Sequence, residues 1–262
     1  MNYTFISGAT GGIGKAFVFE CAKNGYPLFL TGRSEDKLKA LKEEVISAYP
    51  NLVVEYQPCM LNLEQSRKEM FDYIDSKGLV FERIINVAGV DTQLPVMDYS
   101  LEKLLFQLRV NVEGTFTNTF SLLKRRAENV EVINISSMSG VTPMPYFAVY
   151  SATKGCITSF SQSLRLELKK QKVKITAVLP GGVPTRPDII ADIKGQGIWG
   201  KLSAKSPEFV AKKSLKKVKR NKRVYIPGFF NRFLNFTMKI LPLSINMKFI
   251  AHRWKNITKD AF

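Results

Sequence analysis

The stretch Ser7-Gly8-Ala9-Thr10-Gly11-Gly12-Ile13-Gly14 follows a short apolar run near the amino terminus and opens an amphipathic segment. Glycines in this pattern permit a tight turn between a strand and a helix, and they let the backbone approach the phosphates of a dinucleotide. The first amides of such a helix face the bound anion. The stretch therefore predicts a strand, a phosphate-binding turn and a helix, although a glycine-rich turn by itself is also compatible with a plain tight turn.

Outside this turn, short β-branched and aromatic runs alternate with longer amphipathic stretches. The runs that we predict as strands cover residues 3–7, 27–31, 52–56, 83–86, 131–135, 174–179 and 224–226. The predicted helices lie near residues 13–24, 35–48, 64–77, 100–125, 148–170 and 206–220. Strict alternation of this kind predicts an α/β fold of the Rossmann type, with a doubly wound parallel sheet of seven strands and helices on both faces. Because no linker or repeat divides the chain, we expect one domain over residues 1–262.

Composition excludes several classes of enzyme. The chain has 262 residues, 45% of them hydrophobic, and a single histidine, His252. One histidine excludes poly-histidine zinc sites, so no metal site is expected, and it leaves a Ser-His-Asp or Cys-His arrangement only if His252 supplies it. The three cysteines Cys21, Cys59 and Cys156 form no CxxC pair, which indicates a reduced protein without a disulfide framework. We expect these cysteines to pack in the core or against helices. With neither a signal peptide nor a long apolar run in the sequence, we expect a cytoplasmic protein.

The positive charge is concentrated in the last quarter of the chain. The formal net charge is +17, and residues 201–262 hold 16 of the 39 Lys and Arg but only two of the 22 acidic residues. The basic run 212–223 leaves Val210, Leu215 and Val218 on one helical face, so we expect a helix docked by that face with its charges in water. Because the run has little aromatic interleaving and matches no nucleic-acid-binding motif, we expect no nucleic-acid partner.

The end of the second predicted strand bears on the choice of cofactor. A dinucleotide without a 2′-phosphate usually meets Asp or Glu at this position, where the present chain has Gly32 followed by Arg33. Glycine cannot repel a phosphate, and the planar guanidinium of Arg33 can bind one. The pattern favours NADP(H), with NAD(H) as the alternative, and a solvated surface arginine is the competing interpretation of Arg33.

Further motifs follow in a fixed order along the chain. Asn86-Val87-Ala88-Gly89 follows the fourth predicted strand, and Ser137 follows the fifth. Tyr150-Ser151-Ala152-Thr153-Lys154 begins a helix, and Pro180-Gly181 follows the sixth strand. Together with the glycine turn, these motifs resemble the classical short-chain dehydrogenase/reductase superfamily over nearly the whole chain. Within it, the resemblance extends to NADP(H)-dependent hydroxysteroid dehydrogenases and 3-oxoacyl reductases.

The resemblance implies a catalytic tetrad of Asn111, Ser137, Tyr150 and Lys154. It also implies that Asn111 holds a proton-relaying water and that Lys154 holds the nicotinamide ribose. Asn62 stands where the family usually has Asp near the adenine, a departure that affects the adenine contacts. The residues that the resemblance places against the cofactor are Gly8, Thr10, Gly11, Gly12, Ile13, Gly14, Arg33, Asn62, Asn86, Ala88, Gly89, Tyr150, Lys154, Pro180, Gly181, Val183 and Thr185.

The chemistry of these residue types agrees with the resemblance. Tyr150 and Lys154 lie four residues apart, which places them on one face of a helix. A phenol has an ordinary pKa of about 10, and an adjacent ammonium lowers the pKa and so favours proton transfer near neutrality. The Ser137 hydroxyl can hydrogen-bond a substrate carbonyl as negative charge develops on its oxygen. Taken singly, each residue has an ordinary structural explanation, as an interfacial tyrosine, a turn-capping serine or a solvated lysine.

Two segments outside these motifs concern the substrate. Residues 186–205 combine three glycines with Ile198 and Trp199, which predicts a mobile apolar lid. Residues 227–262 form an extension in which residues 229–241 are apolar at near-helical spacing but include Arg232 and Lys239. This pattern is typical of a pocket roof or a subunit contact, which we favour, and also of a helix lying on a membrane surface.

The leading prediction is an oxidoreductase that interconverts a ketone and a secondary alcohol by hydride transfer with NADP(H). By analogy with the relatives, the substrate would be bulky and apolar, such as a hydroxysteroid, a bile acid or a long-chain 3-oxoacyl group. The alternative is a non-catalytic dinucleotide-binding redox sensor, peripheral to a membrane. We expect a small-molecule substrate and a homodimer or homotetramer.

Overall fold

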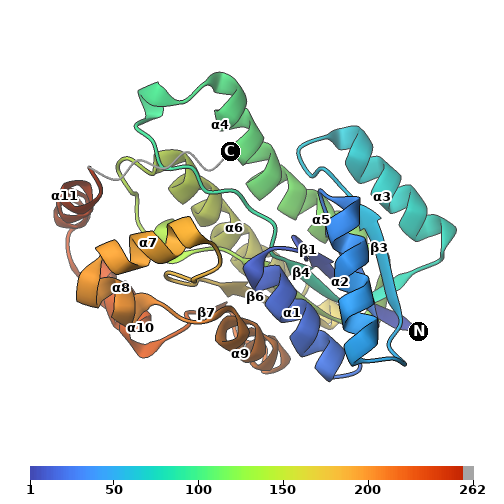
Figure 1. Ribbon diagram of the computed structural model, residues 1–262. Coiled ribbons are helices and arrows are strands. Elements are labelled where there is room, and N and C mark those ends of the chain that lie inside the picture. Colours follow the sequence, from blue (N-terminus) through green and yellow to red (C-terminus); the bar gives the residue numbers. More distant parts are fainter. Residues whose placement is uncertain (256–262) are drawn as a thin grey trace.

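Seven parallel strands form the centre of the fold in the computed structural model, which describes residues 1–255 (Figure 1). The strand order is β3-β2-β1-β4-β5-β6-β7, as expected for the Rossmann-type arrangement. The order reverses between β1 and β4, where a crevice forms beyond the carboxyl ends of the strands. The strands are β1 (Asn2–Ser7), β2 (Leu28–Gly32), β3 (Val54–Pro58), β4 (Val80–Asn86), β5 (Arg126–Ile135), β6 (Val173–Val178) and β7 (Val224–Tyr225).

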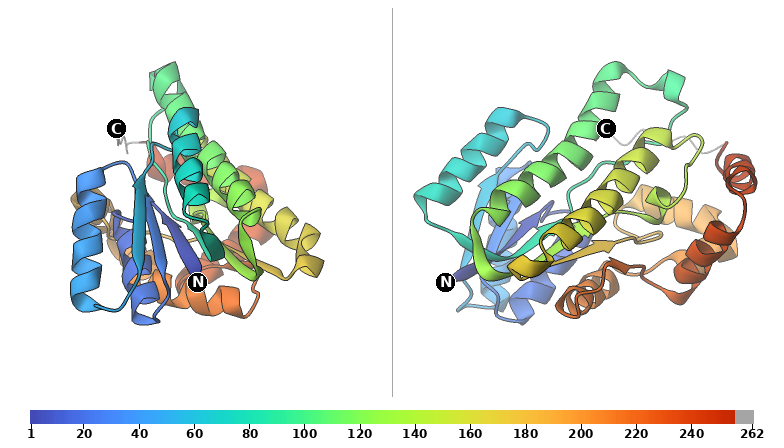
Figure 2. Two further views of the ribbon diagram at one scale, coloured as in Figure 1. Left: turned by 90° about the vertical axis from the view of Figure 1, so that its right-hand side faces the viewer. Right: turned by 180° about the vertical axis from the view of Figure 1, so that it is seen from behind.

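Helices cover both faces of this sheet, as predicted. The left panel of Figure 2 shows α1 and α2 on one side of the strands and α3, α5 and α6 on the other. The helices are α1 (Gly12–Lys23), α2 (Glu35–Ala48), α3 (Glu64–Ser76), α4 (Leu101–Leu108), α5 (Gly114–Leu123), α6 (Ala148–Glu167), α7 (Pro187–Gly195), α8 (Gly197–Ser203), α9 (Pro207–Lys219), α10 (Phe229–Ile240) and α11 (Leu243–Trp254). In residues 1–255, no helix is long and apolar enough to cross a membrane.

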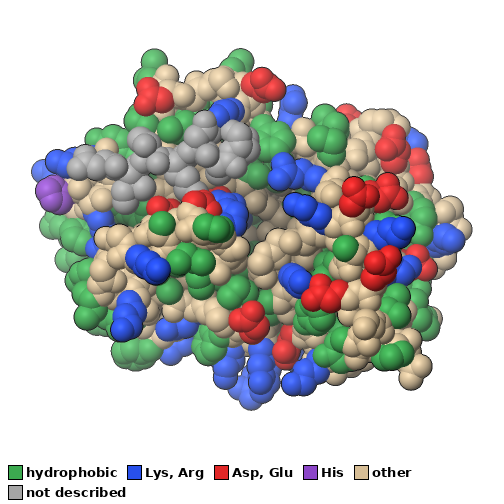
Figure 3. Space-filling model, in the orientation of Figure 1, with side chains coloured by type: hydrophobic (Ala, Val, Ile, Leu, Met, Phe, Trp, Pro, Cys, Tyr) green, Lys and Arg blue, Asp and Glu red, His purple; other side chains and the backbone are tan. Residues whose placement is uncertain are grey.

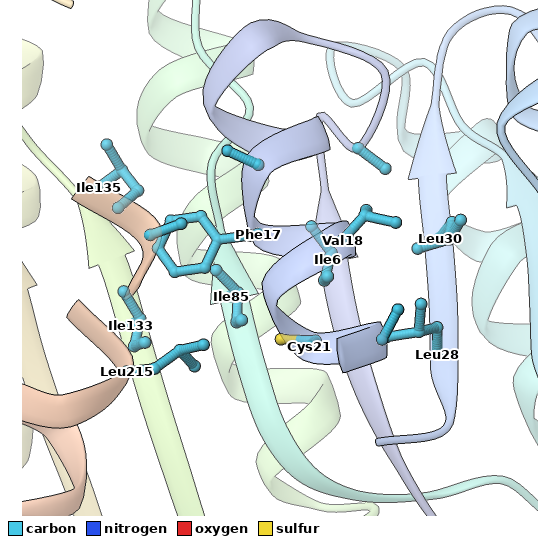
Figure 4. Packing of buried hydrophobic residues seen from close by; sticks show 14 of the residues in the cluster. Ile6, Phe17, Val18, Cys21, Leu28, Leu30, Ile85, Ile133, Ile135 and Leu215 are labelled. Carbon is cyan, nitrogen blue, oxygen red and sulfur yellow. The ribbon is translucent and has the colours of Figure 1, made fainter. Parts of the chain in front are cut away.

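A hydrophobic core fills the space between the sheet and each helical layer. On one face, Phe17 projects from α1 toward Ile85 and Ile135, and Leu215 of α9 lies beside Ile133 (Figure 4). The apolar side of α9 is thus buried, and its basic residues face outward. On the other face, three strand phenylalanines cluster with ring centroids 5.9 to 6.2 Å apart, namely Phe5, Phe29 and Phe81. Burial of both faces of the central strands fixes the register of the sheet.

The helix predicted over residues 100–125 is interrupted in the structure. α4 ends at Leu108, a π-helical turn covers Arg109–Glu113, and α5 begins at Gly114. Such turns often lie at functional sites because they redirect a side chain from the regular helical face. The segment 186–205, predicted as a lid, forms the two short helices α7 and α8.

Candidate functional site

The glycine turn lies between β1 and α1, as predicted, and its shape requires glycine. Gly8 has a φ of +65°, and a Cβ there would stand 2.9 Å from the backbone of Ala88. A Cβ on Gly12 would stand 2.6 Å from the side chain of Thr185. Backbone from β1, β4 and β6 therefore converges where the sheet order reverses, which is the usual dinucleotide site of such folds.

Two further features of this crevice fit a dinucleotide. α1 begins after Gly11 without a side-chain cap, which leaves its first amides available to an anion. The Asn62 side-chain oxygen is buried, with no hydrogen-bond partner among the described residues. A bound adenosine would supply a donor to that oxygen. The residues present thus fit the diphosphate and the adenosine of a nicotinamide dinucleotide.

The other cofactor candidates mostly lie beyond the carboxyl ends of the strands. Arg33 is exposed after β2, at the start of the turn into α2. Asn86 faces away from the crevice, and its buried amide donates to the Asn134 side-chain oxygen at 2.9 Å and to the Thr119 hydroxyl at 3.0 Å. It therefore joins β4 to β5 and α5. The candidates that line the cavity are Ile13, Gly89, Tyr150, Lys154, Pro180, Gly181, Val183 and Thr185.

Asn111 lies in the π-helical turn and is fully buried. Its side-chain oxygen accepts from the Val90 amide at 2.8 Å, and its amide donates to the Val90 carbonyl at 2.9 Å and to the Thr153 hydroxyl at 3.1 Å. Asn111 therefore fixes the loop after β4 against α6. Sequence reasoning named this residue but did not predict these partners.

Lys154 is buried on α6, and its ammonium donates to the Ile135 carbonyl at 3.0 Å. Gly89 leaves room for it, because a Cβ on Gly89 would stand 3.1 Å from the lysine nitrogen. Burial lowers the pKa of Lys154 to about 8, partly offset by the negative charge of Asp91. A lysine with this pKa is mostly charged at neutral pH and can release a proton slightly above it.

Tyr150 lies one turn before Lys154 on α6, as predicted. Its ring stacks on Phe147 with centroids 4.5 Å apart, and the Lys154 ammonium stands 5.5 Å from its ring centre. Burial and the charge of Asp91 raise the pKa of Tyr150, whereas the Ser137 hydrogen bond and the charge of Arg186 lower it. Burial dominates, so the phenol remains protonated at neutral pH.

The expected effect of Lys154 on the pKa of Tyr150 stays a prediction, and the groups that lower this pKa in the structure are Ser137 and Arg186. Proximity on one helix face was correctly predicted, but the burial of both groups was not.

A loop turn brings Ser137 to Tyr150. Ser137 follows β5, and its hydroxyl accepts from the Ser139 amide at 3.1 Å. The same loop reaches the backbone of α6 at Gly140, where a Cβ would stand 2.6 Å from the Lys154 carbonyl carbon. This close approach brings Ser137 near enough to Tyr150 to lower the pKa of the phenol. Ser137, Tyr150 and Lys154 thus lie together at the floor of one cavity.

An ion pair that sequence reasoning missed crosses this cavity. Arg186, directly before α7, donates to Asp91 at 3.0 Å and also contacts Asp188. Asp91 belongs to the loop after β4, so the pair joins that loop to the helical lid. The only signals in the sequence are that Asp91 lies two residues beyond Gly89 and that Arg186 follows Thr185. Neither signal predicts a contact between two residues that lie 95 positions apart in the sequence.

The cavity has a volume of about 640 Å³ and an apolar upper part. The floor carries Ser137, Tyr150 and Lys154, while α7, α8, α10 and α11 form the walls and roof. The C-terminal segment therefore covers the cavity. His252 is exposed on α11. The apolar residues of the upper part include Ile189, Ile193, Phe230, Leu234, Met238 and Phe249.

The fold and this crevice define a nicotinamide-dinucleotide-dependent oxidoreductase with a Rossmann-type sheet. Residues 2–189 match the family model for short chain dehydrogenases. The chain belongs to the short-chain dehydrogenase/reductase family.

Known proteins of this family align with much of the chain. A very-long-chain 3-oxoacyl-CoA reductase of Bos taurus is 30% identical over 228 residues, which are 83% of this chain and 68% of the relative. An uncharacterized oxidoreductase of Staphylococcus epidermidis is 30% identical over 184 residues, which are 69% of this chain and 77% of the relative. The family and these relatives make this chain an oxidoreductase that uses a nicotinamide dinucleotide and a small-molecule substrate.

Solved structures share the fold at lower identity. A structure from a study of 7β-hydroxysteroid dehydrogenase stereoselectivity has a TM-score of 0.83 at 23% identity and covers 95% of this chain and 96% of its own. A bulky-bulky ketone specific alcohol dehydrogenase from Comamonas testosteroni has a TM-score of 0.76 at 18% identity, with 92% of both chains covered. At these identities, the likeness concerns the fold alone.

Proposed function

We propose that this chain is an NADP(H)-dependent oxidoreductase that interconverts a bulky apolar ketone and its secondary alcohol. The observation that carries the proposal is that Ser137, Tyr150 and Lys154 lie together at the floor of a largely apolar cavity. A phenol and a serine hydroxyl can both reach a carbonyl oxygen placed between them. The apolar upper part then favours a substrate whose remaining surface is also apolar.

The protonation states favour reduction of a ketone near neutral pH. The nicotinamide, when bound, supplies or accepts the hydride. Tyr150 donates its proton to the carbonyl oxygen, and its raised pKa keeps that proton available. Ser137 donates a hydrogen bond to the same oxygen as charge develops there. Lys154, charged below a pH of about 8, stabilises the phenolate and, in the bound state, holds the nicotinamide ribose.

The remaining site residues hold the cofactor and position these groups. The backbone of the glycine turn and the first amides of α1 hold the diphosphate. Arg33 binds the 2′-phosphate, which makes NADP(H) the preferred cofactor. Asn62 contacts the adenine. Asn111 fixes the loop after β4 and holds the water through which Lys154 regains its proton.

The substrate class follows from the cavity and from the relatives. One relative is a very-long-chain 3-oxoacyl-CoA reductase, and a structure of similar fold comes from a study of a 7β-hydroxysteroid dehydrogenase. Both substrate classes combine a carbonyl or hydroxyl group with a large apolar body. A cavity of about 640 Å³ with apolar walls suits such a body.

The test is a turnover screen with NADPH and with NADH, followed by nicotinamide absorbance. The panel contains oxosteroids, bile-acid ketones, short-chain and long-chain 3-oxoacyl thioesters, and a small water-soluble ketone. We expect kcat/KM for at least one bulky apolar ketone to exceed that for the small ketone by at least about tenfold, since each buried methylene contributes about 0.8 kcal/mol. Tight cofactor binding without turnover across the panel would instead support a redox sensor.

Replacing Asp91 and replacing Arg186 are expected to shift the pH–rate profile in opposite directions. Asp91 raises the pKa of Tyr150 and Arg186 lowers it. Asp91→Asn should therefore move the alkaline limb of kcat/KM for ketone reduction to lower pH. Arg186→Gln should move it to higher pH. Asp188→Asn is the control, because Asp188 also binds Arg186 but does not act directly on the phenol. A shift in the same direction for both variants would contradict this assignment.

A further inference from the structure

Helix α10 carries two neighbouring apolar stripes, about 100° apart around the helix axis because their residues are offset by one position. Its inner stripe lines the cavity and consists of Phe230, Leu234 and Thr237, continued by Leu241 after the helix. Its outer stripe has the same helical spacing and consists of Phe229, Phe233, Phe236 and Ile240, whose exposed fractions are 77%, 52%, 61% and 65%. A helix that only roofs a cavity needs one apolar stripe toward the cavity and polar residues on the rest of its surface. The outer stripe therefore requires its own explanation.

The outer stripe is continuous with the mouth of the cavity. Five large apolar side chains both line the cavity and are strongly exposed, which places them at its opening. These residues are Trp199, Phe233, Leu241, Ile245 and Phe249. Phe233 belongs to both sets, so the exposed apolar surface extends from α10 into the opening. We call the outer stripe and these mouth residues the apolar rim. An exposed apolar surface of this kind indicates an interaction site.

Helix α10 is fixed in this orientation. Asn231 is 1% exposed, and its amide donates to the Pro227 carbonyl at 2.7 Å and to the Ser203 carbonyl at 2.9 Å. The Ser203 hydroxyl donates to the Asn231 side-chain oxygen at 2.8 Å. Phe230 also contacts the ring of Trp199, with centroids 5.5 Å apart. These contacts hold the inner stripe against the cavity and leave the outer stripe exposed.

The charged side chains on the two helices that carry most of the apolar rim, α10 and α11, are all positive. Residues 229–255 contain no Asp or Glu, and their basic side chains are Arg232, Lys239, Lys248, Arg253 and Lys255. Figure 3 shows hydrophobic and basic side chains along the left and lower left edges, over α8, α10 and α11, with acidic ones sparse there. The basic face of α9 lies along the same lower edge (Figures 1 and 3). An anionic partner surface complements this arrangement.

We infer that the apolar rim docks on the surface of an anionic lipid bilayer. Phenylalanines and leucines flanked by Lys and Arg on an amphipathic helix are what interfacial insertion requires. A second copy of the chain suits the surface poorly, because a two-fold contact would bring its positive charges together. Docking also opens the cavity toward the acyl region, so an apolar substrate can enter from the lipid. That last step rests on the proposed function, whereas the docking does not.

The test is sedimentation of the full chain with vesicles of two compositions. One contains phosphatidylcholine alone, and the other contains equal parts of phosphatidylcholine and phosphatidylserine. We expect binding to the anionic vesicles to be at least about tenfold tighter, since each basic residue near such a surface contributes about 1 kcal/mol. Added salt should weaken this binding, because it screens the field of the lipid headgroups.

Two variants identify the surface that binds. Phe229→Ser combined with Phe236→Ser should lower binding to anionic vesicles by at least about tenfold, because both rings are exposed. Neither residue lines the cavity, so turnover of a small soluble ketone should not change. The matched control combines Phe120→Ser with Leu166→Ser, which are 61% and 72% exposed on α5 and α6. This control should bind vesicles like the unmodified chain.

Several outcomes would overturn the inference. The unmodified chain could ignore both kinds of vesicle, or the Phe229 and Phe236 variant could bind them normally. If that variant instead converts a dimer to a monomer while vesicle binding is absent, the apolar rim is a subunit contact. Saturable binding to a soluble acidic protein without vesicle binding would assign the rim to a protein partner. The vesicle result is separable from the proposed function, since docking is measured without substrate or cofactor.

Discussion

Replacing Tyr150 by phenylalanine is expected to lower turnover by at least about a hundredfold, in line with general acid contributions of about 10² to 10⁴. The substitution removes only the hydroxyl, which lies with Ser137 at the floor of the cavity. The ring can still stack on Phe147 at 4.5 Å, so the packing of α6 should survive. Steady-state turnover and cofactor titration on the same preparation measure the two effects. Cofactor affinity should stay within a few-fold.

A neighbouring tyrosine provides the matched control for this prediction. Tyr146 lies four residues before Tyr150, is 37% exposed and does not line the cavity. Tyr146→Phe removes the same atom and should leave turnover within about twofold, as for most surface substitutions. Turnover of Tyr150→Phe at the level of the unmodified chain would show that Tyr150 is not the proton donor.

Replacing Arg33 by alanine is expected to weaken NADPH binding by roughly 10- to 150-fold and to leave NADH binding nearly unchanged. The range corresponds to the 1.5 to 3 kcal/mol of a hydrogen bond to a charged group. Arg33 follows β2 and is exposed, and this is where we propose that the 2′-phosphate binds. Titration of both cofactors against both proteins measures the difference. Equal losses for the two cofactors, or no loss for either, would remove Arg33 from this role.

The preceding glycine offers an independent test of the same preference. A Cβ on Gly32 would lie 3.5 Å from the Thr10 hydroxyl and 3.7 Å from Leu38, which are ordinary contacts. The space therefore accepts a side chain, and Gly32→Asp should repel the 2′-phosphate while accepting hydrogen bonds from an unphosphorylated ribose. Lys39→Ala, which removes an exposed charge on α2, is the control for general loss of positive charge.

The apolar rim changes how the C-terminal segment is interpreted. Its sequence suggested a pocket roof or subunit contact in preference to a membrane surface. In the structure, α10 lines the cavity with Phe230 and Leu234 and exposes Phe229 and Phe236. One helix can therefore serve as a roof and still meet a lipid surface. A truncation would remove both functions together, so the paired serine variants give the sharper test.

Local patterns predicted most of the fold correctly. The helix predicted over residues 206–220 occurs as α9, because Pro207 starts it and the Ser206 hydroxyl caps the Phe209 amide at 3.2 Å. The break at Arg109–Glu113 was not predicted, since its cause is distant. There Asn111 binds the backbone of Val90, 21 residues earlier in the chain.

The sequence by itself determined the order of strands and helices, the glycine turn at the start of α1 and the placement of Tyr150 and Lys154 on one helix face. These features depend on neighbouring residues, because periodicity and turn chemistry act over a few positions. Only the tertiary structure decided the burial that shifts both pKa values, the ion pair of Asp91 with Arg186, and which apolar stripe of α10 lines the cavity and which is exposed. Each of these depends on which segments, distant in the sequence, the folded sheet brings together, and no local pattern specifies that.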